Sequence, residues 1–123
     1  LCNQVLVSAY MIGICETMLL AEQIGIDPNL VVEVCGSGAA ASWALSNLGM
    51  KVAKSDFQPG FTIANMLKDL KFVTEAASNS SRHLMGVELA QQLFQAVQEL
   101  DGGTGGTQGT QAMIRAYREN QSQ

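Results

Sequence analysis

The sequence predicts an all-α fold, a single helical domain of five to six helices over residues 1–123. Apolar residues recur at helical spacing along most of the chain, and no stretch alternates polar and apolar residues as a half-buried strand does. Glycine, proline and capping residues divide the chain into segments of helix length. The length of 123 residues is that of one ordinary domain, and the sequence contains no internal repeat.

The first expected helix covers residues 1 to about 24 and is apolar on nearly every side, which is typical of a helix enclosed on most sides. The segment Gly25-Ile-Asp27-Pro28 ends it and begins a second helix, because glycine favours a helix C-terminus, aspartate a cap and proline the first turn. The second helix ends at GSGAAAS. This Gly-Ser-Gly follows a helix rather than a strand, so it does not predict a phosphate-binding loop.

Three further helices are expected at about residues 41–53, 62–77 and 84–100, with breaks at Pro59-Gly60 and at the polar segment SNSSRH. The last of the three is two-sided, with an apolar face opposite a face of glutamines and glutamates. The segment DGGTGGTQGTQ lacks the Gly-Lys-Ser/Thr of a nucleotide loop and is predicted to be a mobile loop. A short final helix follows in AMIRAYREN.

Composition limits the classes of partner. Charged residues make up 15% of the chain, below the roughly 25% of average domains, which indicates surface covered by another domain or another copy. The net charge is −4 and no lysine or arginine precedes Lys51, which argues against nucleic acid and against an anionic membrane surface. No group of residues has the spacing of a metal site.

The three cysteines, Cys2, Cys15 and Cys35, form no C-x-x-C pair and lie among apolar residues. They are predicted to be reduced core residues in a reducing compartment, so we expect the protein to be cytoplasmic. The uncharged stretch at residues 5–15 ends at Glu16 and lacks the basic start and cleavage site of a signal peptide. It is shorter than a membrane span and predicts a buried helix, not a membrane partner.

The helix at residues 62–77 has one ordinary apolar stripe and, opposite it, a mixed face. Two phenylalanines share that second face with an amide and two charged groups (Phe61, Asn65, Lys68, Asp69 and Phe72). Such a mixture suits the wall of a ligand cleft. The alternative is a packed helix whose lysine stem lies along its neighbours with its head in water.

Asn3 and Gln4 are amides at the start of a helix that is otherwise apolar. A buried amide must find hydrogen-bond partners. One interpretation is a helix cap or a core network. The other is an amide that orients a substrate hydroxyl or carboxylate.

These two patches resemble those of the β-hydroxyacid dehydrogenases, which include 3-hydroxyisobutyrate dehydrogenase and tartronate semialdehyde reductase. LCNQ and the helix after it resemble the continuation of the family motif K-x-x-N-[NQ]. DFQPGFTIANMLKDLKFVTEAA is similar to its second-domain signature P-G-F…KDL, and AEQIGIDPNLVVEVCGSGAAASWAL fits the segment between. The resemblance covers the whole chain and implies a fold like the C-terminal domain of 6-phosphogluconate dehydrogenase.

The resemblance also implies partners and a cofactor. In the family, an N-terminal Rossmann domain binds NAD or NADP, and a C-terminal all-α domain closes the active site and supplies much of the dimer interface. The chain resembles only the second domain, so the expected partners are the Rossmann domain of the same enzyme and a second copy. The motif places the catalytic lysine directly before Leu1, and an ammonium there would act as general acid and base.

Carried over residue by residue, the resemblance assigns Asn3 to substrate orientation as the catalytic amide, with Gln4 in the same neighbourhood. Phe61 is expected to contact substrate or nicotinamide. Lys68 matches the lysine of the KDL motif near the cofactor, and Asp69 its neighbour.

Two departures from the family pattern concern the chain after these residues. The KDL motif continues as Lys71-Phe72-Val73, and the tail has Gly109-Thr110-Gln111 where many members have Asp-x-Ser. Two functions follow. The first is the C-terminal part of an NAD(P)-dependent 3-hydroxy acid dehydrogenase, which is not expected to be active as this fragment. The alternative is a stand-alone helical module that self-associates without redox activity.

Overall fold

The computed structural model describes residues 1–121 and confirms the all-α prediction. Within these residues the chain forms seven α-helices and two short 3-10 helices: α1 (Cys2–Ile24), α2 (Pro28–Cys35), α3 (Trp43–Lys54), α4 (Ile63–Ser78), α5 (Met85–Gln98), α6 (Leu100–Gly103), η1 (Gly105–Thr107), η2 (Thr110–Met113) and α7 (Ile114–Gln121). Among the α-helices, the prediction of five to six helices lacks only the four-residue α6, in which Asp101 (φ 56°) and Gly102 (φ 73°) are left-handed, so it is a turn within the glycine-rich segment rather than a regular helix.

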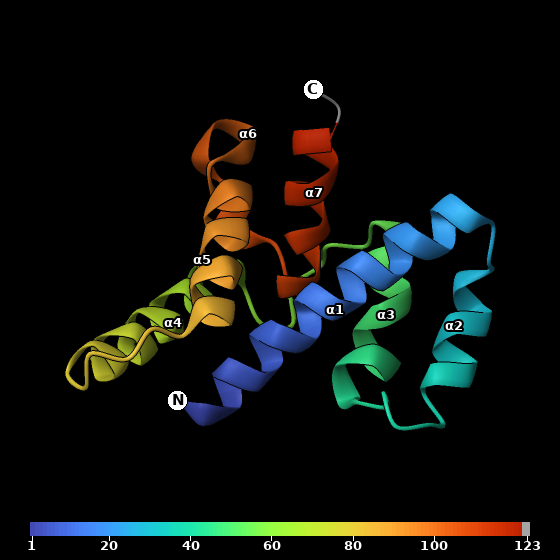
Figure 1. Cartoon of the computed structure of the whole chain (residues 1–123). Coiled ribbons are helices and arrows are strands. Elements are labelled where there is room, and N and C mark those ends of the chain that lie inside the picture. Colours follow the sequence, from blue (N-terminus) through green and yellow to red (C-terminus); the bar gives the residue numbers. More distant parts are fainter. Residues whose placement is uncertain (122–123) are drawn as a thin grey trace.

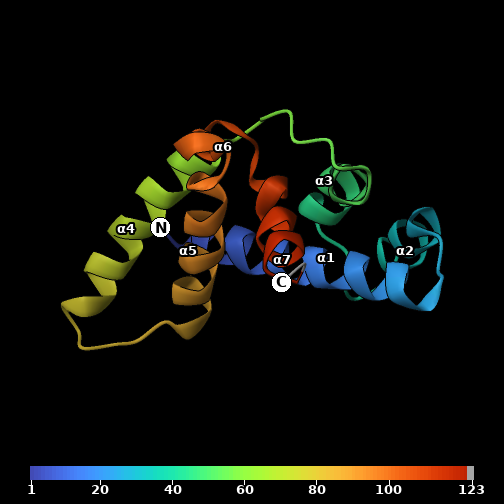
Figure 2. The same cartoon turned by 90° about the horizontal axis from the view of Figure 1, so that it is seen from above.

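Helix α1 is the axis of the domain. It crosses the molecule diagonally, with α2 and α3 on one side and α4 and α5 on the other, while α7 lies beside its middle (Figures 1 and 2). It contacts α2, α3, α4, α5 and η2 directly. A long connection leads from α3 over the top of the domain to α4 (Figure 2). The two helix pairs are therefore held together through α1 and the C-terminal segment.

Local capping explains the helix boundaries. Gly25 adopts a left-handed conformation with φ 77° and ends α1, as its lack of a side chain allows. The Asp27 carboxylate accepts a hydrogen bond from the Asn29 amide at 2.9 Å and caps α2, as predicted. Ser42 caps α3 in the same way, with its Oγ accepting from the Leu45 amide at 2.9 Å. This cap is why α3 begins at Trp43 rather than at the predicted residue 41.

The core lies where the stretch of α1 from Ser8 to Ala21 meets α3, α4, α5, η2 and the start of α7. It is aliphatic and rich in methionine, and Phe94 is its largest side chain. Its fully buried members include Met11, Val52, Ile63, Met66, Leu70, Phe94, Val97, Met113 and Ile114. The apolar stripe predicted for α4 is confirmed, since Ile63, Met66, Leu70 and Val73 are buried.

The prediction of a mobile glycine-rich loop fails for its second half, since residues 101–104 are exposed but most of residues 105–111 are buried. Gly105, Gly106 and Gly109 are buried, and the segment continues directly into the buried η2. The reason is close packing: a Cβ on Gly105 would lie 1.8 Å from the Val97 carbonyl oxygen. Glycine here allows backbone to lie against backbone, so it serves packing rather than flexibility.

Within this chain α1 is not enclosed on most sides, as expected for an apolar helix that the other helices of one small domain cannot fully cover. One stripe of α1 is buried, but the opposite stripe carries exposed apolar side chains: Leu6, Tyr10, Leu20 and Ile24 are 44–59% exposed. We call these four residues the α1 stripe.

By length and composition alone α1 could cross a membrane, with a mean hydropathy of 1.6, and a core helix passes the same test.

Candidate functional site

A cleft of about 820 Å³ opens between the start of α1, α3 and the segment that leads into α4. Its walls are mostly apolar, with several amides and one charged group. The lining residues are Asn3, Gln4, Val7, Trp43, Asn47, Leu48, Lys51, Gly60, Phe61, Met66, Thr110 and Gln111. We call it the α1–α3 cleft. A concave, largely apolar site with a few converging polar groups is the usual form of a small-molecule site.

The amides at the start of α1 form a chain with an acid on α4. The Asn3 Nδ2 donates to the Gln4 Oε1 at 3.1 Å, and the Gln4 Nε2 donates to the Asp69 Oδ2 at 2.8 Å. The Gln4–Asp69 bond joins two segments 65 residues apart and fixes the Gln4 amide. Among residues 1–121 the Asn3 side chain bonds only to Gln4, so its Oδ1 and the second hydrogen of its Nδ2 are available to a ligand hydroxyl.

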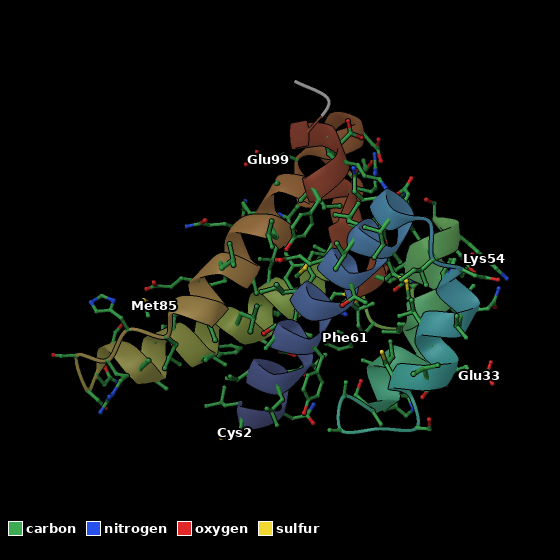
Figure 3. The ribbon with its side chains drawn as sticks, turned by 45° about the vertical axis from the view of Figure 1, so that its right-hand side comes forward. Cys2, Glu33, Lys54, Phe61, Met85 and Glu99 are labelled. Carbon is green, nitrogen blue, oxygen red and sulfur yellow. The ribbon has the colours of Figure 1, made fainter. Side chains whose placement is uncertain are left out.

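A second wall carries Phe61, which lies next to the N-terminal half of α1 (Figure 3). The segment before it is held by Gln111, which is 1% exposed. The Gln111 Nε2 donates to the carbonyl oxygens of Asp56 at 3.0 Å and Gln58 at 2.8 Å. The Thr110 amide then donates to the Phe61 carbonyl at 3.0 Å. The departure from the family pattern near Gln111 therefore forms part of the frame of the cleft.

The third wall is α3, and sequence reasoning missed it. Trp43, Asn47 and Lys51 are spaced four residues apart, so they lie along one face of the helix, and all three line the cleft. The opposite face of α3 is buried through Ala44, Leu45 and Val52 among others. A signal was present in the sequence: a Trp-Asn-Lys stripe beside an apolar stripe on one helix.

The mixed face of α4 is divided in the structure. Phe61 and, through Gln4, Asp69 belong to the α1–α3 cleft. Lys68 does not line that cleft; it lines a separate groove of about 480 Å³ between α4 and α5 together with Lys71, Gln91, Gln95 and Gln98. Phe61 is 41% and Phe72 53% exposed, so this face of α4 is open for contact with another domain.

The groups with shifted pKa values lie outside the cleft. Burial, with a smaller contribution from Glu16, raises the pKa of the Cys15 thiol to about 12, so this cysteine is not a nucleophile at neutral pH. Burial and a 2.7 Å hydrogen bond to Glu16 raise the pKa of Tyr117 above its usual range. Residues 1–121 contain no cluster of three histidine, cysteine or acidic side chains able to hold a metal ion.

Comparison with known proteins identifies the family. The sequence model described as the NAD-binding domain of NADP-dependent 3-hydroxyisobutyrate dehydrogenase matches residues 1–117. The chain belongs to the 3-hydroxyisobutyrate dehydrogenase family. It is 54% identical over 97% of its length to an uncharacterized oxidoreductase of Synechocystis, and 32% identical over 88% to a probable 3-hydroxyisobutyrate dehydrogenase-like protein of Arabidopsis thaliana.

The fold of this 3-hydroxyisobutyrate dehydrogenase-family chain also matches a solved structure. The crystal structure of 3-hydroxyisobutyrate dehydrogenase from Salmonella typhimurium superposes on 92% of the chain with a TM-score of 0.82 at 24% identity. The chain spans 39% of that structure, and 39% and 32% of the Synechocystis and Arabidopsis relatives. The family prediction made from LCNQ and the KDL segment is confirmed.

Proposed function

We propose that this chain is the C-terminal helical domain of an NAD(P)-dependent dehydrogenase. The enzyme transfers hydride between the nicotinamide and a small 3-hydroxy acid or its semialdehyde. The observation that carries the proposal is the hydrogen-bonded chain from Asn3 through Gln4 to Asp69 at the edge of the α1–α3 cleft. These two amides stand at the positions to which the family resemblance assigns substrate orientation, and their hydrogen bonds to each other and to Asp69 support that role.

In this proposal Asn3 orients the substrate. The second hydrogen of its Nδ2 amide donates to the oxygen of the substrate hydroxyl, while Gln4, fixed by Asp69, keeps the Asn3 amide in place. Holding the reacting carbon in line with the nicotinamide is worth several orders of magnitude in rate. The lysine of the motif, directly before Leu1 in the intact enzyme, lies three residues from Asn3 and so on the same face of the helix. It takes the hydroxyl proton as hydride leaves.

The cofactor would be NAD or NADP, held mainly by a Rossmann domain outside this chain. When bound, it supplies the hydride acceptor or donor. The α4–α5 groove offers Lys68, Lys71 and three glutamine amides, a donor set that fits the phosphates of a dinucleotide. In this proposal Lys68 contributes to that site, and Asp69 links it to the Gln4 side of the cleft.

The enzyme proposal is tested by assaying the full-length protein and the 123-residue chain side by side. We expect the full-length protein to reduce NAD or NADP with a 3-hydroxy acid, and the chain alone to be inactive. Lys68→Ala should raise the KM for the cofactor without lowering the melting temperature, because Lys68 is exposed. Turnover by the chain alone would contradict the proposal, as would Lys68→Ala lowering the melting temperature at unchanged kinetics.

The exposed α1 stripe supports a second role, closing the active site and pairing two subunits. The same exposed stripe also favours the alternative, a helical module that self-associates and has no redox activity. Apolar patches of more than a few hundred Å² usually mark interfaces, and twofold dimers are the commonest assembly. Sedimentation of the 13.1 kDa chain should give the dimer mass, and Leu6→Glu with Leu20→Glu should give the monomer. A monomer at high concentration would contradict this role.

We further propose that the protein is cytoplasmic and that neither nucleic acid nor a membrane is its partner.

A further inference from the structure

Lys51 differs from every other residue that lines the α1–α3 cleft. It is the single charged side chain among the lining residues, and the other polar side chains there are amides, the Thr110 hydroxyl and the Trp43 indole. Among residues 1–121 no ion pair or side-chain hydrogen bond to Lys51 is recorded. It is half-buried, in contrast to the exposed Lys54 one turn later. The cleft thus has one cation with no acidic partner inside the protein.

The surroundings of Lys51 suit an anion of small size. Leu48 and Val7 line the same cleft and reduce the water around the ammonium, which strengthens its attraction to a negative charge. Residues 1–50 contain no lysine or arginine, and the motif's lysine before Leu1 is assigned to the hydroxyl end of the substrate beside Asn3, which leaves Lys51 for the other end. An ammonium carries three donors and binds a carboxylate as a compact point charge.

We propose that Lys51 is a specificity-determining residue that binds the carboxylate of the substrate in the α1–α3 cleft. The inference rests on the proposed function, because it takes the same cleft as the substrate site. The Asn3 amide then takes the hydroxyl-bearing end of the molecule, the apolar wall takes its short carbon chain, and Lys51 takes its charged end. The cleft selects 3-hydroxy acids over uncharged 3-hydroxy compounds of the same shape.

The test compares 3-hydroxyisobutyrate with its uncharged primary amide, which has nearly the same shape. Binding of each compound to the full-length protein is measured by titration calorimetry, and kcat/KM is measured with NAD and NADP. Lys51→Gln should weaken binding of the acid about 10- to 100-fold and leave binding of the amide unchanged, because only the acid loses a charge-assisted contact. Lys51→Arg should keep most of the preference.

Lys54→Gln is the matched control. It removes the same charge from the same helix, but Lys54 is exposed and lies at the outer edge of the domain, away from Phe61 (Figure 3). Its preference for the acid should equal that of the natural protein. Circular dichroism and the melting temperature check that each variant is folded, and Lys51→Arg still tests the inference if Lys51→Gln does not fold.

Four results would overturn the inference. The natural protein could show no preference for the acid, or Lys51→Gln could lose acid and amide binding equally. Lys54→Gln could show the same loss as Lys51→Gln, or Lys51→Gln could raise the KM for NADP and keep the preference for the acid. The last result would assign Lys51 to the cofactor.

Calorimetry separates this inference from the proposed function, because it measures binding of the acid independently of hydride transfer. A protein that binds the acid through Lys51 but transfers no hydride would contradict the dehydrogenase proposal and support the role of Lys51.

Discussion

Two glycine-bearing segments, residues 36–41 and 102–109, are similar in composition and differ in their surroundings. The first follows α2, and most of its residues are exposed; a Cβ on Gly36 would lie 2.3 Å from the Val32 carbonyl oxygen, but one on Gly38 would come no closer than 3.8 Å to any other atom. The second begins exposed at residues 102–104, but Gly105 and Gly106 are packed against the end of α5, and Gln108 and Gly109 form backbone hydrogen bonds with Ile63 and Phe57. A glycine-rich run can therefore be a turn or part of a packed core, and the partner across the contact decides which.

The consequence reaches the cleft. The Gly109 amide donates to the Phe57 carbonyl at 2.9 Å, and Gln111 holds the carbonyls of Asp56 and Gln58. Gly109 must lack a side chain because a Cβ there would lie 2.3 Å from the Gln111 side chain. The segment at residues 105–111 thus fixes the backbone of the connection that carries Phe61. The exposed segment at residues 36–41 has no such role in the cleft.

The largest effect is expected at Gly105. Gly105→Ala would place a methyl group 1.8 Å from the Val97 carbonyl oxygen, so the backbone of the packed segment must move. We expect a loss of about 3 kcal/mol or more in the free energy of unfolding, which is in the range of severe core overpacking. Chemical denaturation measures it.

The matched change in the exposed segment is Gly38→Ala, which should alter stability by less than about 0.5 kcal/mol. Equal effects at Gly38 and Gly105 would remove the difference between the two segments.

An intermediate effect is expected at Gln111. Gln111→Leu puts an apolar side chain of similar size in the same place but leaves the Asp56 and Gln58 carbonyls without their donor, which should cost about 1–3 kcal/mol. The exposed Gln92 on α5 serves as control, because its side chain forms no hydrogen bond within residues 1–121 that Gln92→Leu would remove. Equal melting temperatures of the two variants would show that the Gln111 clamp contributes nothing to stability.

The smallest effect is expected at Asp101, where the packed segment begins. Arg115 donates to both carboxylate oxygens at 2.7 and 2.9 Å and holds the pKa of Asp101 below its usual range. A lowered folded-state pKa stabilises the protein above the unfolded-state pKa of about 3.9, and this contribution is lost as the pH falls through the folded value.

Asp101→Asn is the suitable variant, because asparagine also tolerates the left-handed conformation at φ 56°. The natural protein should be slightly more stable than the variant at pH 7, and the two melting curves should converge in acid below pH 4. A difference in melting temperature that stays constant across this range would show that the ion pair is not its cause.

The sequence predicted what local rules determine. Asp27 and Pro28 mark the start of α2 through capping and ring geometry, and the periodicity of Ile63, Met66 and Leu70 defines the buried stripe of α4. The family motif singled out Asn3 and Gln4, but only the structure shows their connection to Asp69.

What the sequence could not predict depends on contacts between distant segments. Gln111 bonds to Asp56 across 55 residues, and no local pattern marks a glutamine as buried. Lys68 shares a helical face with Phe61, yet the position of α5 places it in a different groove. The sequence contains the polar stripe of α3, but not that α1 and the segment carrying Phe61 lie opposite Trp43 and Lys51 and form a cleft with them.

The central claim is that the α1–α3 cleft is where the substrate binds. The most direct test is a crystal structure of the full-length protein with NADP and a 3-hydroxy acid bound. We expect the acid in this cleft, with its hydroxyl near Asn3 and its carboxylate within hydrogen-bond distance of Lys51. An acid bound in the α4–α5 groove beside Lys68, with the cleft filled only by water, would contradict the account.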